Sequence, residues 1–491
     1  MLSQLKDQRV LRRDILASLV VFLVALPLCV GVAVASGVPA ELGLVTGIVG
    51  GLVVGFLPGS SLQVSGPAAG LTVLVYEAVE EFGTGALGAI VLASGLLQLA
   101  LGALGFGRWF RAISVAVVQG MLAGIGLVLV LGQVYAMADT AQPSGGLGKI
   151  AGLPGLIGEI VTNGTALTAF LVGAGTVAVL VVWPRLPARV RVVPGALAAV
   201  ALATGATLLF DLPLAKVEVK GLLESIQPPG FEDFGQLVGV AAIGTVLAFT
   251  LIASAESLFS AAAVDRMHDG PRTDYNKELM AQGVGNTVCG ALGALPMTAV
   301  IVRSAANVQA GARTPLSRIL HGLWLLLFAA LLPAAIGVIP LAALAAVLVH
   351  AGCKLVPVRD LVPLWREHRG EAVILAVTAL AILVTNLFEG VILGLLLAVV
   401  KTAWEISHLH LDVRELTGGR LVVSFTGNAT FLRLPRTLEQ LEALPKDRPI
   451  ELDLSGLRHV DHACRIALEN WALRHNDAET EPVRMHPPNV S

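Results

Sequence analysis

Long apolar segments recur along the chain up to residue 405, and each is close to the length of a membrane crossing. A helix needs about 20 mainly apolar residues to span the hydrocarbon core of a bilayer. Eleven segments approach this length: 15–36, 40–57, 84–104, 112–134, 165–183, 193–210, 237–263, 317–334, 338–353, 371–385 and 387–405. Three more are shorter or interrupted: 64–78, 280–294 and 296–311. The sequence therefore predicts an all-α polytopic membrane domain with about fourteen spans.

The composition supports the membrane assignment. Hydrophobic residues make up 55% of the 491 residues and charged residues only 14%, whereas soluble domains average about 25% charged residues. The net charge of −2 gives no reason to expect a nucleic-acid partner. Residues 1–12 are polar and basic and lead into the first apolar segment without a small-residue cleavage site, so we expect a first span and not a removed signal peptide.

Basic residues gather in alternate loops. Five segments hold most of the Lys and Arg: 107–111, 183–191, 265–277, 311–318 and 353–369. They fall on one side if fourteen spans are threaded from an inside N-terminus, and the opposite loops are poor in Lys and Arg except for 211–236. The positive-inside rule then predicts two cytoplasmic termini in a cell (inner, plasma) membrane.

The pattern of apolar and polar residues changes after residue 406. The segment 419–432 alternates like a strand, 436–445 has the pattern of an amphipathic helix, 449–457 is strand-like and 462–476 is helix-like. We expect a transport domain over 1–406, with repeats of about 12–210 and 237–406, and a small cytoplasmic α/β domain over 407–491.

Two interrupted segments have matching places in the two halves. The motif "SGPAAG" at 65–70 follows Pro27 by about 39 residues, and "LPMTAV" at 295–300 follows Glu256 by about 43. Short, broken segments in corresponding positions are typical of inverted-repeat transporters whose site lies at the bilayer midplane.

These broken segments can place helix starts inside the membrane. Ser65 could cap a helix, Gly66 permits close approach and Pro67 suits a first helical turn; Pro296 and Thr298 could act in the same way before Ala299. Helix starts carry unpaired N–H groups and a partial positive charge, which favour an anion. Two facing starts would form a cationic niche.

Charged residues inside apolar segments are functional candidates, because each costs several kcal/mol in lipid. Glu256, followed by Ser257 and Ser260, could carry a proton, bind sodium together with Ser260, or hydrogen-bond the substrate. Arg303 could complete an anion site, although snorkelling or pairing with Glu256 are alternatives.

Other polar residues receive simpler interpretations. We expect Asn307, Asp265 and Arg266 to be solvated or gating contacts near the cytoplasm. Glu77, Glu80 and Glu81 should form a solvated end face. Cys29 and Cys289 should be packing residues, and the scattered Cys353 and Cys464 imply no disulfide framework.

Enzyme signatures are missing from the sequence. It contains no HExxH, GxSxG or P-loop motif, and "HLHLD" at 408–412 lacks further metal ligands. We therefore expect a protein that is not an enzyme and needs no cofactor.

Three stretches resemble the SulP anion transporters: "QVSGPAAGLTVLV" (63–75), the segment 256–286 and the segment 293–322. The tail resembles the STAS domain that follows the membrane part in this family. The resemblance implies a seven-plus-seven inverted repeat with core and gate domains, usually in a homodimer. It also implies a substrate site lined by Leu28, Ala68, Ala69, Glu256, Ser260, Ala299, Val300 and Arg303.

Several residues depart from the family pattern. Sodium-binding relatives have a hydroxyl at the position of Ile301, so a possible Na⁺ site at Glu256, Ser260 and Ala299 is disfavoured against protonation of Glu256. Leu28 and Ala68 also replace polar residues found in other members, which leaves more of the anion binding to backbone N–H groups. In the tail, His462 follows Asp461 where signalling STAS domains have a Ser, which excludes phosphorylation at that point.

The resemblance and the residues together predict a secondary active transporter of bicarbonate or sulfate that works by an elevator-type mechanism. We expect symport with H⁺ through Glu256, with Na⁺ as the alternative coupling ion. A dicarboxylate such as fumarate is the alternative substrate. A nucleobase carrier, an uncoupled anion channel or exchanger, and a regulated sensor are the competing functions.

Overall fold

The structure is a computed structural model that describes residues 8–112, 114–187, 189–191, 193–416, 419–476 and 482–487. The chain divides into two compact units, Met1–Gly394 and Leu395–Ser491. The first unit is helical apart from two short strands, and the second contains a four-stranded sheet.

The main helices follow the apolar segments of the sequence. They are α1 (Gln8–Ala35), α2 (Ala40–Leu52), α3 (Thr72–Ala103), α4 (Val115–Met137), α7 (Gly164–Val182), α8 (Gly195–Leu209), α10 (Val240–Val264), α11 (Tyr275–Ala291), α12 (Ile301–Gln309), α13 (Leu316–Leu331), α15 (Leu341–Leu355), α17 (Arg369–Val384) and α18 (Leu387–Ile406). Shorter pieces connect them: η2 (Val54–Phe56), η3 (Ala69–Leu71), η4 (Phe106–Ala112), α5 (Gly146–Ala151), α6 (Leu153–Thr162), η5 (Trp183–Arg185), α9 (Phe231–Gln236), α14 (Ala334–Gly337) and α16 (Val358–Glu367).

The structure confirms a mostly helical membrane protein. Among the described residues, six helices are long and apolar enough to cross a bilayer, and five shorter apolar helices accompany them. Two expected segments, 64–78 and 84–104, share the helix α3, which bends at Gly83, where φ is 81°. The segment 280–294, expected to be shorter or interrupted, belongs to the continuous 17-residue helix α11. The count of fourteen spans stays a prediction.

One basic segment that was expected to be a loop contains a helix. Residues 358–367 form α16, which carries Arg359 and Arg366 beside exposed apolar residues such as Val362 and Trp365. A helix with one basic and one apolar face is suited to the surface of a bilayer. The sequence did not predict α16 because this helix is short and strongly charged and therefore contains no apolar stretch of 20 residues.

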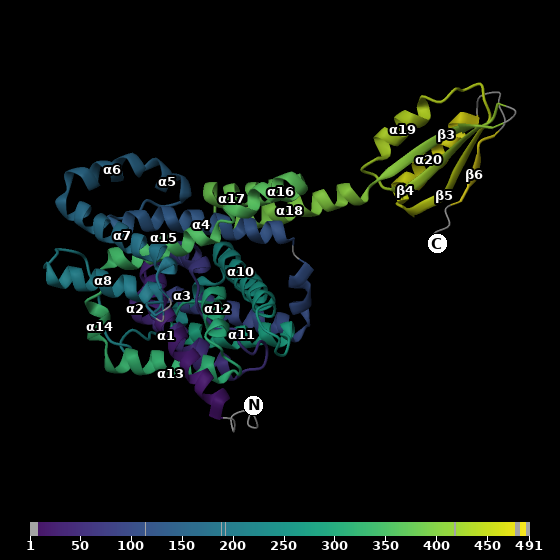
Figure 1. Cartoon of the computed structure of the whole chain (residues 1–491). Coiled ribbons are helices and arrows are strands. Elements are labelled where there is room, and N and C mark those ends of the chain that lie inside the picture. Colours follow the sequence, from purple (N-terminus) through teal and green to yellow (C-terminus); the bar gives the residue numbers. More distant parts are fainter. Residues whose placement is uncertain are drawn as a thin grey trace. The chain divides into compact units, whose positions relative to one another are not determined.

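The helices of the first unit pack in two groups. One group, which we call the crossing group, consists of α1, α2, α3 and α10–α13. The other, which we call the flanking group, consists of α4, α7, α8, α15 and α17. Figure 1 shows α4, α7 and α15 running together beside α1, α2 and α3. Contacts of α15 with α1 and of α4 with α3 join the groups.

Buried polar contacts tie the loops together at one end of the crossing group. Asp14 accepts hydrogen bonds from the backbone N–H groups of Arg313 (2.7 Å) and Thr314 (3.2 Å). Arg318 donates to the backbone oxygens of Ser60 (2.6 Å) and Leu57 (3.0 Å). The basic segment 311–318 and the start of α1 therefore lie at the same end of the unit.

The long connection between the two halves, 210–239, is fixed at the opposite end. Glu41 Oε1 accepts hydrogen bonds from the N–H groups of Lys220 (2.6 Å) and Gly221 (3.2 Å). The N–H of Ala215 donates to Asp139 Oδ2 at 3.1 Å, and Val217 N–H donates to Ile339 O at 3.1 Å. The connection thus contacts α2 of the crossing group as well as residues beside α4 and α15 of the flanking group.

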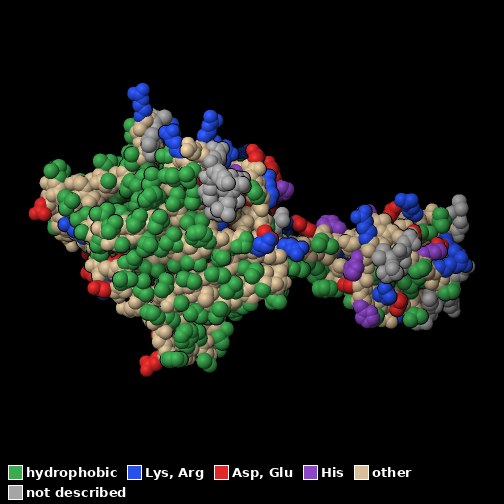
Figure 2. Space-filling view, turned by 90° about the horizontal axis from the view of Figure 1, so that it is seen from below, with side chains coloured by type: hydrophobic (Ala, Val, Ile, Leu, Met, Phe, Trp, Pro, Cys, Tyr) green, Lys and Arg blue, Asp and Glu red, His purple; other side chains and the backbone are tan. Residues whose placement is uncertain are grey.

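The second unit is a small α/β domain, as its sequence predicted. Its strands are β3 (Leu409–Glu415), β4 (Leu421–Ala429), β5 (Ile450–Val460) and β6 (Arg484–His486), in the order β3-β4-β5-β6. The first pair is antiparallel and the other two are parallel. Helices α19 (Leu434–Glu442) and α20 (His462–Asn476) complete the unit. Figure 2 shows mixed charged and His side chains on this unit, whereas hydrophobic side chains cover much of the visible face of the larger one.

Asp461 joins two segments of the small unit. Its carboxylate accepts hydrogen bonds from the backbone N–H groups of Phe431 (2.5 Å) and Cys464 (2.7 Å). Burial favours the neutral acid, but these hydrogen bonds outweigh burial and hold the pKa of Asp461 below its usual range. Asp461 therefore acts as an N-terminal cap for α20 and as a tie to the end of β4.

We expect close packing of α2 on α13 to depend on glycine. A Cβ at Gly51 would lie 2.4 Å from the Cα of Gly322, whereas a Cβ at Gly175 in α7 would meet nothing within 4 Å. Gly51→Ala should lower the midpoint of thermal unfolding of the purified protein, because overpacking typically costs about 1–3 kcal/mol. Gly175→Ala is the matched control, and equal midpoints for the two variants would contradict this account.

Candidate functional site

Two short strands cross inside the first unit. β1 (Ser65–Pro67) and β2 (Met297–Ala299) pair antiparallel, with Ser65 opposite Ala299 and Pro67 opposite Met297. Both strands are buried throughout. Extended backbone at membrane depth is tolerated only where protein or a cavity satisfies its polar groups. Each strand supplies hydrogen-bond partners for the backbone of the other strand.

The strands correct the expected positions of the helix starts. Ser65 and Pro67 do not cap or open a helix, because they lie in β1; η3 begins at Ala69 and α3 at Thr72. In the second half, Thr298 lies in β2 and α12 begins at Ile301. The expectation was wrong because Ser, Gly and Pro before a helix are equally compatible with an extended segment, and only the partner strand decides between the two.

The pairing brings the two helix starts to the same place. Neither α3 nor α12 has a side-chain cap at its N-terminus. Uncapped N-termini leave backbone N–H groups without intrahelical partners and carry partial positive charge. Both halves of the chain thus contribute a positive helix end to the crossing.

Glu256 lies beside this crossing. A Cβ at Gly70 would be only 2.8 Å from Glu256 Oε1, so the absence of a side chain at Gly70 gives the carboxylate its place at the start of α3. The Thr298 side chain is a neighbour of the same carboxylate. Glu256 Oε2 is buried and has no hydrogen-bond partner among the described residues. Such an orphaned oxygen in the membrane requires a proton, a cation or water.

Three hydroxyl groups near the helix starts are unsatisfied as well. Ser260 Oγ, Thr298 Oγ1 and Thr72 Oγ1 are buried without a partner among the described residues. Ser260 follows Glu256 by one turn of α10, and Thr72 is the first residue of α3. Thr72 was not among the predicted lining residues, although its place two residues after "SGPAAG" was a usable signal.

Arg303, predicted to line the anion site, lies against the backbone of β1. Its side chain is completely buried, and Nη2 donates to Pro67 O at 3.2 Å. A Cβ at Gly66 would lie 2.3 Å from Nη1. Cys29 and His321 are its other neighbours, and no ion pair joins it to Glu256 among the described side chains. The guanidinium therefore contacts the backbone of β1 next to the crossing.

The remaining predicted lining residues are divided between surface and interior. Leu28, Ala69 and Val300 are partly exposed, whereas Ala68 and Ala299 are 2% and 1% exposed. Ala299 N–H donates to Ser257 Oγ at 3.2 Å, which attaches β2 to α10. Ile301 is 40% exposed.

Asn307 and Asp265 are corrections to the expected solvated contacts. Asn307 is completely buried, and its Nδ2 donates to Leu62 O at 2.9 Å. Asp265 is 7% exposed and accepts from Thr273 Oγ1 at 2.8 Å. Both residues hold loops at the ends of broken segments. A single polar residue in a short helix gave no signal of which backbone oxygen it would meet.

A network of hydrogen bonds between buried polar side chains supports β1 and β2. Asn286 exchanges hydrogen bonds with the backbone of Met297, at 2.7 Å and 3.1 Å, and donates to Gln98 Oε1 at 2.7 Å. Gln98 in turn donates to Ser254 Oγ at 3.1 Å. Gln282 donates to Ser65 Oγ at 2.7 Å. These residues, which the sequence analysis missed, connect β1 and β2 with α3, α10 and α11.

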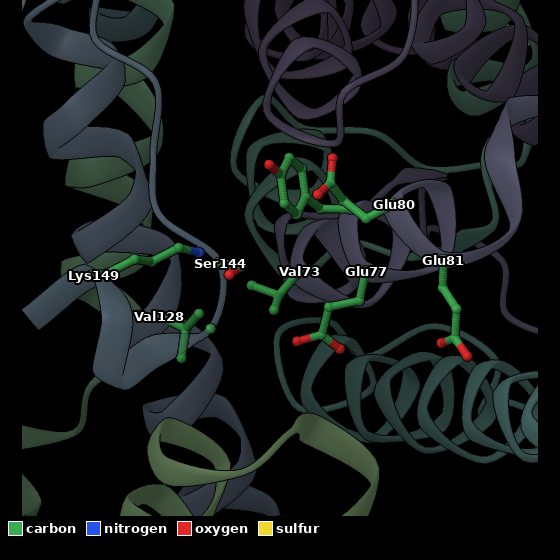
Figure 3. Close-up of a pocket in the computed structure, with 9 residues that line it drawn as sticks. Val73, Glu77, Glu80, Glu81, Val128, Ser144 and Lys149 are labelled. Atoms are coloured by element: carbon green, nitrogen blue, oxygen red, sulfur yellow. The ribbon is translucent and has the colours of Figure 1, made fainter.

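A hollow of about 260 Å³ lies farther along α3. Figure 3 shows Lys149 reaching toward α3, which carries Glu77, Glu80 and Glu81. Glu80 and Glu81 are exposed as expected, but Glu77 is partly buried. Lys149 is 5% exposed, and its Nζ lies 5.9 Å from the centroid of the Tyr76 ring. Burial lowers the pKa of the Lys149 ammonium, and the Glu77 carboxylate partly opposes this effect.

Tyr76 also lines a second hollow of about 200 Å³, between α1 and α15. The wall of this hollow includes Gly31 and Ala35 of the crossing group and Gly132 and Leu344 of the flanking group. The two hollows mark the seam between the helix groups at the end where the 210–239 connection is fixed. Within the described ranges, no group of three or more His, Cys, Asp or Glu is placed to hold a metal ion.

Comparison with known proteins identifies the family. The model of the "Sulfate permease family" matches residues 11–378. The bicarbonate transporter BicA of Picosynechococcus sp. (strain ATCC 27264 / PCC 7002 / PR-6) is 27% identical over 425 residues, which cover 82% of this chain and 72% of BicA.

Two solved structures share the fold. The transmembrane domain of a cyanobacterial bicarbonate transporter BicA has a TM-score of 0.65 and 23% identity, and the match covers 80% of this chain and 98% of that domain. The murine anion transporter Slc26a9 in the inward-facing state has a TM-score of 0.81 and 16% identity, with 99% and 87% coverage. These relatives are membrane transporters, so this protein is a transporter and not an enzyme. The chain belongs to the sulfate permease family.

Proposed function

We propose that the protein is a secondary active transporter of a small inorganic anion, bicarbonate or sulfate, which binds at the crossing of β1 and β2. The observation that supports this proposal is a set of polar groups at the crossing that have no hydrogen-bond partner among the described residues. Two uncapped helix starts meet beside a buried carboxylate oxygen and three buried hydroxyls that have no partner among the described residues. A site with these properties accepts an anion at the helix ends and a cation or proton at the carboxylate.

The anion site consists largely of backbone. Ala68, Ala69, Ala299 and Val300 offer no polar side-chain atom, so N–H groups at the helix starts supply the hydrogen bonds. The Arg303 guanidinium, which donates a hydrogen bond to Pro67 O, adds positive electrostatic potential next to the site. Because backbone donors distinguish charge and size more than identity, bicarbonate and sulfate are both compatible with this site. Fumarate, which is longer and dianionic, is the alternative.

Coupling is assigned to Glu256. An ionised carboxylate beside the helix starts competes with the substrate for positive potential, whereas a neutralised one does not. Protonation of Glu256 would therefore favour anion binding, which is the linkage that symport requires. Na⁺ is the alternative partner, because the free oxygens of Ser260 and Thr298 supply ligands that offset the apolar Ile301.

Transport by this site would follow an elevator-type movement of the crossing group against the flanking group. The seam with its two hollows is compatible with such a movement, because the hollows leave space between the two groups. We further propose a homodimer in the plasma membrane with cytoplasmic termini, and a STAS-type role for the small α/β unit in contact with protein partners.

Substrate identity is tested by uptake into proteoliposomes. We expect labelled bicarbonate or sulfate to accumulate when a proton gradient is imposed, and fumarate to accumulate less. A sodium gradient at constant pH tests the alternative coupling ion. Uptake that only follows the anion's own gradient, whatever the cation, would contradict symport and favour a channel or exchanger.

Glu256→Gln should abolish gradient-driven accumulation, because the amide can neither release a proton nor balance a sodium ion. Glu80→Gln is the matched control, because it removes an exposed carboxylate from the same membrane unit. This variant should accumulate anion as the wild type does. Size-exclusion profiles and thermal midpoints of both variants check folding. Normal accumulation by a folded Glu256→Gln protein would remove Glu256 from the coupling role.

Arg303→Ala should weaken anion affinity about tenfold, which corresponds to about 1.4 kcal/mol, because positive potential behind the site is lost. Arg303→Lys keeps the charge and should retain most of the affinity. Arg313→Ala, which removes an exposed arginine, should leave the affinity unchanged. Titration of anion binding by calorimetry gives the comparison, and equal affinity of Arg303→Ala and wild type would mean that the helix starts suffice.

A further inference from the structure

A cavity of about 810 Å³ opens at the end of α10, away from the crossing. Its charged lining comes from Arg108 of η4 and from Arg266 and Arg272 of the α10–α11 connection. Its apolar wall is formed by Leu258, Phe259 and Ala262 of α10 together with Val115 at the start of α4. The cavity is therefore amphipathic, with cationic groups at one end and hydrocarbon at the other.

The described residues provide no acidic partner for the three arginines. Arg266 Nε donates to Ala262 O at 3.2 Å, and Arg272 donates to the backbone oxygen of Asp265. Among the described residues, none of the three forms an ion pair with a carboxylate. Each guanidinium has five N–H donors, so most of their hydrogen-bonding capacity remains available.

The two aspartates in the lining are already engaged. Asp265 accepts hydrogen bonds from Thr273 N (3.1 Å) and Thr273 Oγ1 (2.8 Å). Asp274 caps α11 through the N–H of Lys277 at 3.2 Å and pairs with the Lys277 ammonium at 3.2 Å. Lys277 compensates the charge of Asp274, whereas Asp265 keeps its negative charge. The three arginines outnumber this one carboxylate, so the cavity presents a net positive surface to a ligand.

The cavity lies where a lipid meets the protein. The candidate span α10 ends at Val264, one residue before the charged segment, while Leu258, Phe259 and Ala262 belong to its last two turns. Val115 is 67% exposed, and Trp109, next to Arg108, is 72% exposed. Exposed Trp beside basic residues is typical of a membrane interface. The arginines thus sit at headgroup level and the apolar wall at acyl-chain level.

Volume separates the possible anions. An inorganic oxyanion fills only a few times the ~30 Å³ of a water molecule, and it would make no use of the apolar wall. Basic pockets between membrane helices are suited to the headgroups of anionic phospholipids. We propose that this cavity binds one anionic phospholipid, with its phosphate on Arg108, Arg266 and Arg272 and an acyl chain along α10.

The occupied site would join two parts of the fold. Arg266 and Arg272 flank the end of α10, the helix that carries Glu256, whereas Arg108 and Val115 belong to the connection that leads into α4 of the flanking group. One lipid would thus contact both sides of the seam. This site is independent of which anion is transported.

Native mass spectrometry of the full chain, released from bilayers of phosphatidylglycerol and phosphatidylcholine, tests the proposal. We expect wild type to retain about one phosphatidylglycerol per chain in preference to phosphatidylcholine. Arg108→Gln, Arg266→Gln and Arg272→Gln combined should lower this retention at least fivefold. The matched control combines Arg185→Gln, Arg189→Gln and Arg191→Gln, three exposed arginines of another basic loop, and should retain the lipid.

A second variant distinguishes a lipid from a free anion. Ala262→Trp fills the apolar wall and keeps all three arginines, so it should lower phosphatidylglycerol retention if an acyl chain lies there. Inorganic phosphate, sulfate and bicarbonate at millimolar concentration should not displace the lipid. Equal retention by the arginine variant and wild type, no effect of Ala262→Trp, no headgroup preference, or displacement by these small anions would each overturn the proposal. The Ala262→Trp arm also decides the question if the triple variant fails to fold.

Discussion

The antiparallel pairing of β1 with β2 is the interaction on which the rest of the membrane unit depends. Breaking a helix inside a bilayer exposes backbone groups that lipid cannot satisfy. The pairing of Ser65 with Ala299 resolves this for both halves at once, because each strand is the other's partner. It also determines that α3 and α12 start at the same place, so that their positive ends coincide.

Several apparently separate features serve this crossing. Asn286 and Gln282 hold the strands through their backbone and side-chain atoms. Gly66 and Gly70 lie four residues apart, and each leaves space for one charged group, Arg303 and Glu256 respectively. The segment thus contacts a cation that supports the backbone at one glycine and a carboxylate with a free oxygen at the other. This separation explains how opposite charges can lie close to a single site without neutralising each other as an ion pair.

The two hollows along α3 and the amphipathic cavity at α10 lie at different ends of the unit. One end holds Lys149 near acidic residues of α3, and the other holds arginines for which the described part of the chain provides no acidic partner. Each hollow involves residues from both helix groups or from the connection between them. A transporter that moves one group against the other requires such weakly packed places, since a close-packed seam would resist sliding.

The sequence by itself determined the membrane class, most of the helices, the small α/β unit and the importance of two broken segments. These follow from local properties, namely apolar length, alternation, and the cost of Glu256 and Arg303 in lipid. Only the tertiary structure decided that Ser65 and Pro67 lie in a strand, that Arg303 contacts the backbone of β1 and that Asn307 is buried. Those outcomes depend on contacts between residues more than 200 positions apart, such as Ser65 with Ala299 and Pro67 with Arg303, and no local pattern records such a partner.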